Sequence, residues 1–261
     1  MLNISEFKEL ISLFEEFSEK EIPHKRLEID KGKDAFEGTV NKLKELGVFD
    51  EESKSLPLPV RLLILMKLAK GEAGIAQYVA KVWSVGNLGI ARSDKLVQFP
   101  SDRVYYYGKL AEFEGKEVEV LGLRSCRWAL GRIKVLGDYE NLDGEILFYD
   151  IACLVGISEA ALESAESYAK ERRAFEKPIY EFEEIRGFIE RGRSKIESLK
   201  WALLVSEDPL KILDFALETS QFCTEKAMQI FGGYSFINEY PVQKFLRDAR
   251  MMRSILIRKL W

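Results

Sequence analysis

The sequence has only one histidine and three cysteines among its 261 residues, and this scarcity excludes several kinds of site. His24 lies beside Pro23 in a loop-like stretch, so histidine-based metal sites are excluded and a Ser-His-Asp triad would depend on that one position. We expect His24 to be exposed and inert. Cys126, Cys153 and Cys223 are widely separated and lack C-x-x-C spacing, which indicates buried free thiols rather than disulfides or zinc ligands.

Long apolar runs and blocks of one charge are missing as well. No apolar run approaches the roughly 18 residues of a membrane-spanning helix, and the acidic start MLNISEFKELISLFEEF has no export core, so we expect a cytoplasmic protein without a membrane partner. The 39 basic and 43 acidic residues are mixed along the chain and give a formal net charge of -4, which argues against a nucleic-acid partner. A hydrophobic content of 47% suffices for a sizeable core.

Apolar residues recur at helical spacing near both ends of the chain, and this pattern predicts helices there. The N-terminal helices are expected at residues 4–17, 35–46, 59–71 and 73–88. Four longer helices are expected at residues 151–174, 182–205, 209–231 and 242–260, and their short connections indicate an antiparallel bundle. In the last helix, Arg247, Asp248 and Arg250 fall mostly outside the apolar stripe.

The stretch between these helical parts, residues 96–148, has the composition of β-strands. RVYYYGKL, KEVEVLGL and GRIKVL are short, rich in β-branched and aromatic residues, and separated by glycines. We therefore predict a mainly α fold with an N-terminal helical domain (1–95), a reduced β-domain (96–150) and a C-terminal four-helix bundle (151–261). A bundle with apolar residues on more than one helix face must cover the second face, which predicts a homodimer or homotetramer.

Two long motifs lie in the C-terminal half. QIFGG and EYPVQKFLRDAR, within residues 227–250, join a helix end, a glycine pair and a helix that opens at a proline. GISEAALESAESYAKERRAFEKPI occupies residues 156–179. In this order and at this separation, the motifs resemble the C-terminal signature and the E-R-x-x-F-G-K-P-I turn of the acyl-CoA dehydrogenases, flavoenzymes that form the α,β double bond of acyl-CoA thioesters. The sequence is identified as a truncated, divergent member of that family.

The resemblance implies FAD as cofactor and acyl-CoA as substrate. Arg172 would reach the pyrophosphate of a flavin held mainly by a partner subunit, with Phe175 near the adenine. Gln229, Gly232 and Gly233 would approach the same dinucleotide from the other subunit, through the amide and through exposed backbone N–H groups. From the residues alone, the glycine pair is a helix cap and Arg172 a solvated arginine at a helix end.

The sequence departs from the family in its flavin-binding residues. The family's T-E-P-x-x-G-S-D type segment, which holds the flavin ring and phosphates, has no counterpart, since the only threonines, Thr39, Thr219 and Thr224, lie in predicted helices. Glu176 replaces the glycine after the aromatic residue, and Glu183 replaces a glutamine shortly after it. Two negative charges near a pyrophosphate predict that FAD binding is weak or lost.

The family's catalytic base is also missing. In most members it lies nine residues after the arginine of R-D-A-R, and counting from Arg247 gives Leu256. A minority use a glutamate at the start of the first C-terminal helix, where this sequence has Ile146 with Glu145 beside it. Glu145 is thus either a relocated base or an acid in the turn NLDGE, and the catalytic residue stays unassigned.

Two functions therefore remain open. The first is flavin-dependent α,β-dehydrogenation of acyl-CoA thioesters with a relocated base. The second is a non-catalytic subunit or scaffold that pairs with itself or with a complete homologue. The carried-over residues Arg172, Gln229, Gly232 and Gly233 favour the first function, whereas Leu256 and the shortened β-domain favour the second.

Overall fold

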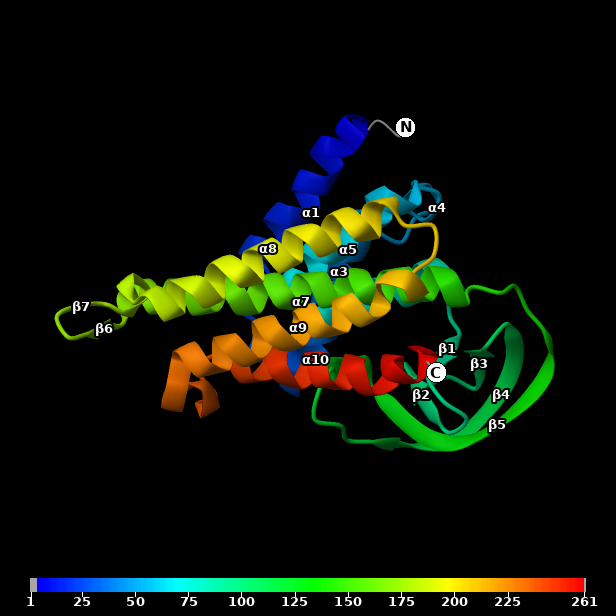
Figure 1. The fold of residues 1–261 in the computed structure, drawn as a ribbon. Coiled ribbons are helices and arrows are strands. Elements are labelled where there is room, and N and C mark those ends of the chain that lie inside the picture. The colour runs from blue at the N-terminus through cyan, green and yellow to red at the C-terminus, as the bar shows by residue number, and fades with distance from the viewer. Residues whose placement is uncertain (1–3, 261) are drawn as a thin grey trace.

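The computed structural model describes residues 4–260 and is mainly helical, with five strands gathered at one side (Figure 1). The N-terminal helices are α1 (Lys8–Lys20), α2 (Arg26–Lys31), α3 (Lys33–Glu45), α4 (Glu51–Lys54), α5 (Leu58–Gly71) and α6 (Ala73–Val85). The four helices predicted here are confirmed. The sequence pattern missed α2 and α4, which have six and four residues and are too short to show an apolar period.

Local sequence explains where α5 and α6 begin and end. Pro59 stands in the first turn of α5, where its missing N–H costs nothing. Glu72 caps α6 because its carboxylate accepts a hydrogen bond from the N–H of Ile75 at 2.7 Å. Gly86 ends α6 with φ of 59°, a conformation that favours glycine.

The strands β1 (Gly89–Ala91), β2 (Leu96–Gln98), β3 (Arg103–Tyr106), β4 (Lys109–Val118) and β5 (Trp128–Asp138) close into a barrel in the order β1-β2-β5-β4-β3. The predicted β-region is thus confirmed, but it begins at Gly89 rather than at residue 96. β1 is only three residues long, yet it completes the barrel because it pairs antiparallel with β2 and parallel with β3.

The C-terminal bundle consists of α7 (Asp143–Glu171), α8 (Glu183–Val205), α9 (Leu210–Phe231) and α10 (Val242–Leu256), which confirms the four predicted helices. The expectation of strand structure for residues 143–148 is wrong, because α7 already begins at Asp143. Its first turns continue the apolar face, and Ile146 and Tyr149 are buried. α7 packs against α5, α6, α8, α9 and α10 and forms the centre of the core.

The scarce reactive side chains lie as predicted. Cys126, Cys153 and Cys223 are free and buried, and burial raises the pKa of the Cys153 and Cys223 thiols to about 12. His24 is exposed. Within residues 4–260, no cluster of histidine, cysteine and acidic side chains could hold a metal ion, and no helix is long and apolar enough to cross a bilayer.

Candidate functional site

The ends of α7 and α9 meet at one end of the bundle, which we call the bundle end (Figure 1). Arg172 follows α7, and its N–H donates to the carbonyl of Tyr168 at 2.8 Å. The guanidinium carbon of Arg172 lies 5.6 Å from the ring centre of Tyr234, in the 3-10 turn Gly232–Phe236 that follows α9. One chain therefore brings Arg172 and the glycine pair to the same place.

Stacked aromatic rings hold the bundle end together. Tyr168 on α7 stacks on Phe231 of α9, with ring centres 4.2 Å apart. Tyr240, just before α10, meets Phe231 at 5.2 Å and Tyr168 at 6.1 Å. Because these rings come from three segments, the end of α7, the end of α9 and the start of α10 are fixed relative to one another.

The groups at the bundle end suit a phosphate-containing ligand. The Arg172 guanidinium makes no hydrogen bond to another residue of the described part, so its donors are available. Gly232 has φ of 58°, which favours glycine, but a Cβ on Gly233 would meet nothing within 4 Å. Packing within the chain therefore does not require Gly233. The Gln229 amide oxygen is exposed and accepts from the Lys226 amine at 2.9 Å.

Phe175 lies at the tip of a hairpin between β6 (Arg173–Ala174) and β7 (Lys177–Pro178), which projects from the bundle (Figure 1). The Phe175 side chain is 90% exposed and meets the Phe182 ring edge-on at 6.3 Å. Phe175 and Glu176 form the two-residue turn with φ of 49° and 65°. Left-handed backbone at both positions is typical of type I′ hairpin turns, which favour glycine or asparagine.

Glu176→Gly should raise the free energy of unfolding by about 1 kcal/mol, because glycine adopts the left-handed conformation without steric cost. Urea denaturation measures this change. Ala174→Gly is the matched control: Ala174 lies in the neighbouring strand β6 without positive φ, so glycine there should destabilise. Destabilisation by Glu176→Gly would show that the carboxylate contributes more than the strain costs.

The position expected for the catalytic base carries no acid and faces the core. Leu256 is the last residue of α10 and is 1% exposed. Glu145 does not lie in a turn as the alternative held, but in the first turn of α7. Its Oε1 accepts hydrogen bonds from Arg61 Nη1, at 2.8 Å, and from the Tyr149 hydroxyl.

A small cavity lies next to the first turns of α7. This cavity, which Ile146 and Tyr149 line, has a volume of about 10 Å³. That is close to the space that one water molecule needs. Burial raises the pKa of Tyr149, so its hydroxyl stays protonated and can keep donating to Glu145.

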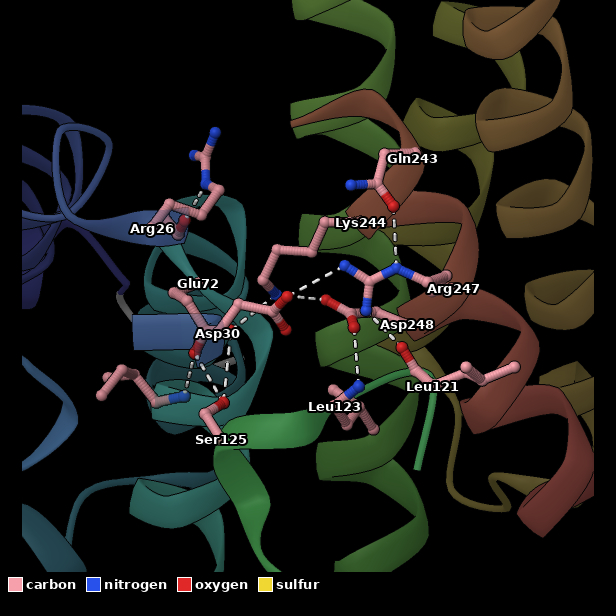
Figure 2. A network of polar contacts seen from close by, with 12 residues as sticks. Arg26, Asp30, Glu72, Leu121, Leu123, Ser125, Gln243, Lys244, Arg247 and Asp248 are labelled. Atoms are coloured by element: carbon pink, nitrogen blue, oxygen red, sulfur yellow. Dashed lines mark hydrogen bonds and ion pairs between the residues drawn. The ribbon is translucent and has the colours of Figure 1, made fainter. Parts of the chain in front are cut away.

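A buried ionic network connects α10 with the N-terminal helices and the barrel (Figure 2). Lys244 Nζ donates to Glu72 Oε1 at 2.7 Å and to Asp248 Oδ2, and all three side chains are about 1% exposed. Burial by itself lowers the pKa of Lys244, but the carboxylates of Asp248 and Glu72 outweigh this effect and raise the pKa above its usual value. Asp248 also accepts the N–H of Leu123, before β5, at 2.6 Å.

Arg247 and Asp248, the first two residues of the R-D-A-R motif, thus stabilise the tertiary structure of this chain. Arg247 Nη2 lies 2.9 Å from Asp30 of α2, and its Nη1 donates to the carbonyl of Leu121. The sequence pattern placed Asp248 mostly outside the apolar stripe, and that placement is wrong, because the carboxylate is buried. The sequence does hold a signal for this burial, because Lys244 lies four residues before Asp248 on the same helix, the spacing of an ion pair.

Comparison with known proteins identifies the motifs. The family model "Acyl-CoA dehydrogenase, C-terminal domain" matches residues 214–255, from α9 through the glycine pair to α10. The chain is 36% identical over 110 residues to the caffeyl-CoA reductase-Etf complex subunit CarC of Acetobacterium woodii, and 34% identical over 108 residues to a short-chain specific acyl-CoA dehydrogenase of Megasphaera elsdenii. The C-terminal part of the chain is therefore similar to the C-terminal domain of the acyl-CoA dehydrogenases. Each match covers 37% of this chain and 28% of the relative, so it spans less than a third of these relatives' length.

Solved structures share the fold of this chain. Butyryl-CoA dehydrogenase from Megasphaera elsdenii superposes with a TM-score of 0.66 at 19% identity, covering 97% of this chain and 94% of that one. A chain from a structure of the electron transferring flavoprotein of Acidaminococcus fermentans gives a TM-score of 0.71 at 18% identity, with 100% and 99% covered. At these identities the likeness shows the fold alone.

Proposed function

We propose that the chain is a non-catalytic acyl-CoA dehydrogenase-related subunit, whose bundle end contacts an FAD held mainly by a second copy or by a complete homologue. The observation that carries this proposal is Leu256, a buried leucine at the position of the family's catalytic carboxylate. Such a subunit retains the family's fold and part of its dinucleotide contacts, but it does not catalyse the family's reaction.

Dehydrogenation of an acyl-CoA requires a carboxylate that removes the α-proton, while a bound flavin supplies the hydride acceptor. Leu256 has no group that can take a proton. Glu145 has one, but its Oε1 already accepts hydrogen bonds from Arg61 and Tyr149. Neither position therefore offers a carboxylate that is free to take the α-proton.

The bundle end supports the retained contact with FAD. Arg172 would hold the pyrophosphate, because a guanidinium donates paired, charge-assisted hydrogen bonds to phosphate oxygens. Gly232 and Gly233 would offer backbone N–H groups, and Gln229 its amide. Glu176 and Glu183 are exposed close by in sequence and disfavour an anion, so the expected affinity is low.

Exposed apolar side chains support association with another subunit. Trp201 and Val205 at the end of α8 are 69% and 71% exposed, and Phe236 beside the bundle end is 78% exposed. Trp201 and Val205 are four residues apart on α8 and so share one helix face, and large apolar side chains that gather in this way mark interaction surfaces. The caffeyl-CoA reductase-Etf relative is itself named as a subunit of a complex, which fits a partner of the same class for this chain.

One observation favours the alternative, a flavin-dependent acyl-CoA dehydrogenase with Glu145 as relocated base. The Glu145 side chain remains 29% exposed, in the first turn of α7, where a minority of the family carries its base. A partner or ligand that displaced Arg61 would free this carboxylate. The pairing seen here argues against that state in the isolated chain.

Arg172→Ala should weaken FAD binding at least about tenfold, because the charged donor is removed. Titration calorimetry of the assembled protein measures this change. Arg191→Ala is the matched control, since Arg191 is an exposed arginine on α8. Equal affinity of wild type and Arg172→Ala for FAD would show that the bundle end is not the dinucleotide site.

A further inference from the structure

A cavity of about 730 Å³ lies between the N-terminal helices and the barrel, apart from the bundle end. Its lining includes aromatic side chains of Phe36 on α3, Tyr78 on α6, Phe99 after β2 and Trp128 in β5. The rings of Phe36 and Phe99 meet the Tyr78 ring edge-on, with centres 5.6 and 5.5 Å away. The volume falls in the range of about 300–1,000 Å³ that is usual for small-molecule sites.

Lys81 on α6 is the polar group that sets this cavity apart. It lines the cavity and is 7% exposed, and its amine lies 5.4 Å from the centre of the Tyr78 ring, which lines the same cavity. In the part of the chain that the structure describes, no carboxylate pairs with this amine. Burial lowers the pKa of Lys81 to about 8. A buried ammonium without a counter-charge costs stability, so packing alone does not account for it.

The other charges around the cavity select the kind of anion that can enter. Asp30 is already paired with Arg247, and Glu117 with Arg127, so these acids are balanced. Glu37, Asp102 and Glu119 line the cavity as well and add negative charge. Lys31, Arg124 and Arg127 also line the cavity but are exposed, so Lys81 is the buried cation of this lining. One negative charge on a ligand matches that single buried ammonium, and the acids of the lining disfavour further negative charge.

We infer that this cavity binds a small monocarboxylate with an aromatic or branched apolar body, whose carboxylate pairs with the Lys81 amine. The aromatic walls accept the apolar body, and the carboxylate supplies the counter-charge that Lys81 lacks. The site does not depend on the proposed contact with FAD, because it shares no residue with the bundle end. Failure of one proposal leaves the other standing.

Titration calorimetry of the full chain with sodium phenylacetate tests the site. Phenylacetate should bind, and its uncharged analogue phenylacetamide should bind at least about tenfold more weakly, because a charge-assisted hydrogen bond is lost. Phenyl phosphate should also bind more weakly than phenylacetate. This comparison of ligands on the wild-type protein does not rely on any variant folding.

Lys81→Met should weaken phenylacetate binding at least about tenfold and raise the melting temperature by about 2–4 °C, since it removes an unpaired buried charge. If Lys81 served only packing, its replacement by methionine would not weaken phenylacetate binding while raising the melting temperature. Lys195→Met is the matched control, because Lys195 also lies over an aromatic ring, 5.5 Å from Phe215, but does not line the cavity. It should leave phenylacetate binding unchanged.

Three results would overturn the inference. The first is no binding of phenylacetate or isovalerate to the wild-type protein at about 10 mM, a concentration well above ordinary ligand dissociation constants. The second is equal phenylacetate affinity in Lys81→Met, which would separate the lysine from the ligand. The third is tighter binding of phenyl phosphate than of phenylacetate, which would contradict the selection of a single negative charge.

Discussion

Supplied with FAD and acyl-CoAs of short, medium and long chain, the purified protein should reduce an electron-accepting dye at least about 100-fold more slowly than a family member with its base. General-base catalysis contributes about 10²- to 10⁴-fold to such reactions, and the position of the base carries Leu256. The leucine is buried in the core at the end of α10, so no rearrangement of its own side chain can supply a proton acceptor.

Glu145→Gln decides between the two functions in the same dye assay. Glu145 is the remaining candidate base, and the glutamine keeps its shape while removing its proton affinity. Glu159→Gln is the matched control, because Glu159 is another α7 glutamate paired with a cation, Lys200. Ordinary turnover by the wild type that disappears in Glu145→Gln and persists in Glu159→Gln would establish the relocated base and refute the non-catalytic subunit.

Restoring a carboxylate at position 256 is a less direct test. Leu256→Glu would place a charge where the side chain is 1% exposed, and an unpaired buried carboxylate costs several kcal/mol. Loss of structure would then hide any gain of chemistry. The residue that removes the family's base therefore also contributes to the core of this chain.

Lys244→Ala should lower the free energy of unfolding by about 3–5 kcal/mol, because it leaves the buried carboxylates of Glu72 and Asp248 without their cation. Urea denaturation at neutral pH measures the loss. Lys20→Ala serves as control, since the Lys20–Glu16 pair is exposed and its removal should leave stability nearly unchanged. A small effect of Lys244→Ala would mean that the network does not hold α10 to α6 and the barrel.

A triple variant separates the cost of unpaired charge from the cost of lost packing. Lys244→Met with Glu72→Gln and Asp248→Asn removes all three charges while the amide oxygens can still accept the N–H groups of Ile75 and Leu123. Most of the stability lost in Lys244→Ala should return. If the triple variant is as unstable as Lys244→Ala, the shape of Lys244 rather than its charge stabilises this junction.

The sequence by itself predicted the elements whose signals are local. α8 ends at Val205 and α9 at Phe231, as the apolar spacing, Pro209 and Gly232 indicated. The two C-terminal motifs likewise indicated the resemblance to the acyl-CoA dehydrogenases, because each motif is a continuous run of residues. These predictions succeed since helix periodicity, capping and turn residues act over a few positions of the chain.

Long-range contacts decided the rest. The three residues of β1 form a strand only because β2 and β3 pair with it, and Asp248 is buried because Lys244 joins it to Glu72, 172 residues before Lys244. Glu145 is held by Arg61 of α5, a contact that no local pattern indicates. Lys81 likewise meets its cavity only when α3, α6 and the barrel come together. Burial and pairing are properties of the assembled core, so tertiary structure determined them.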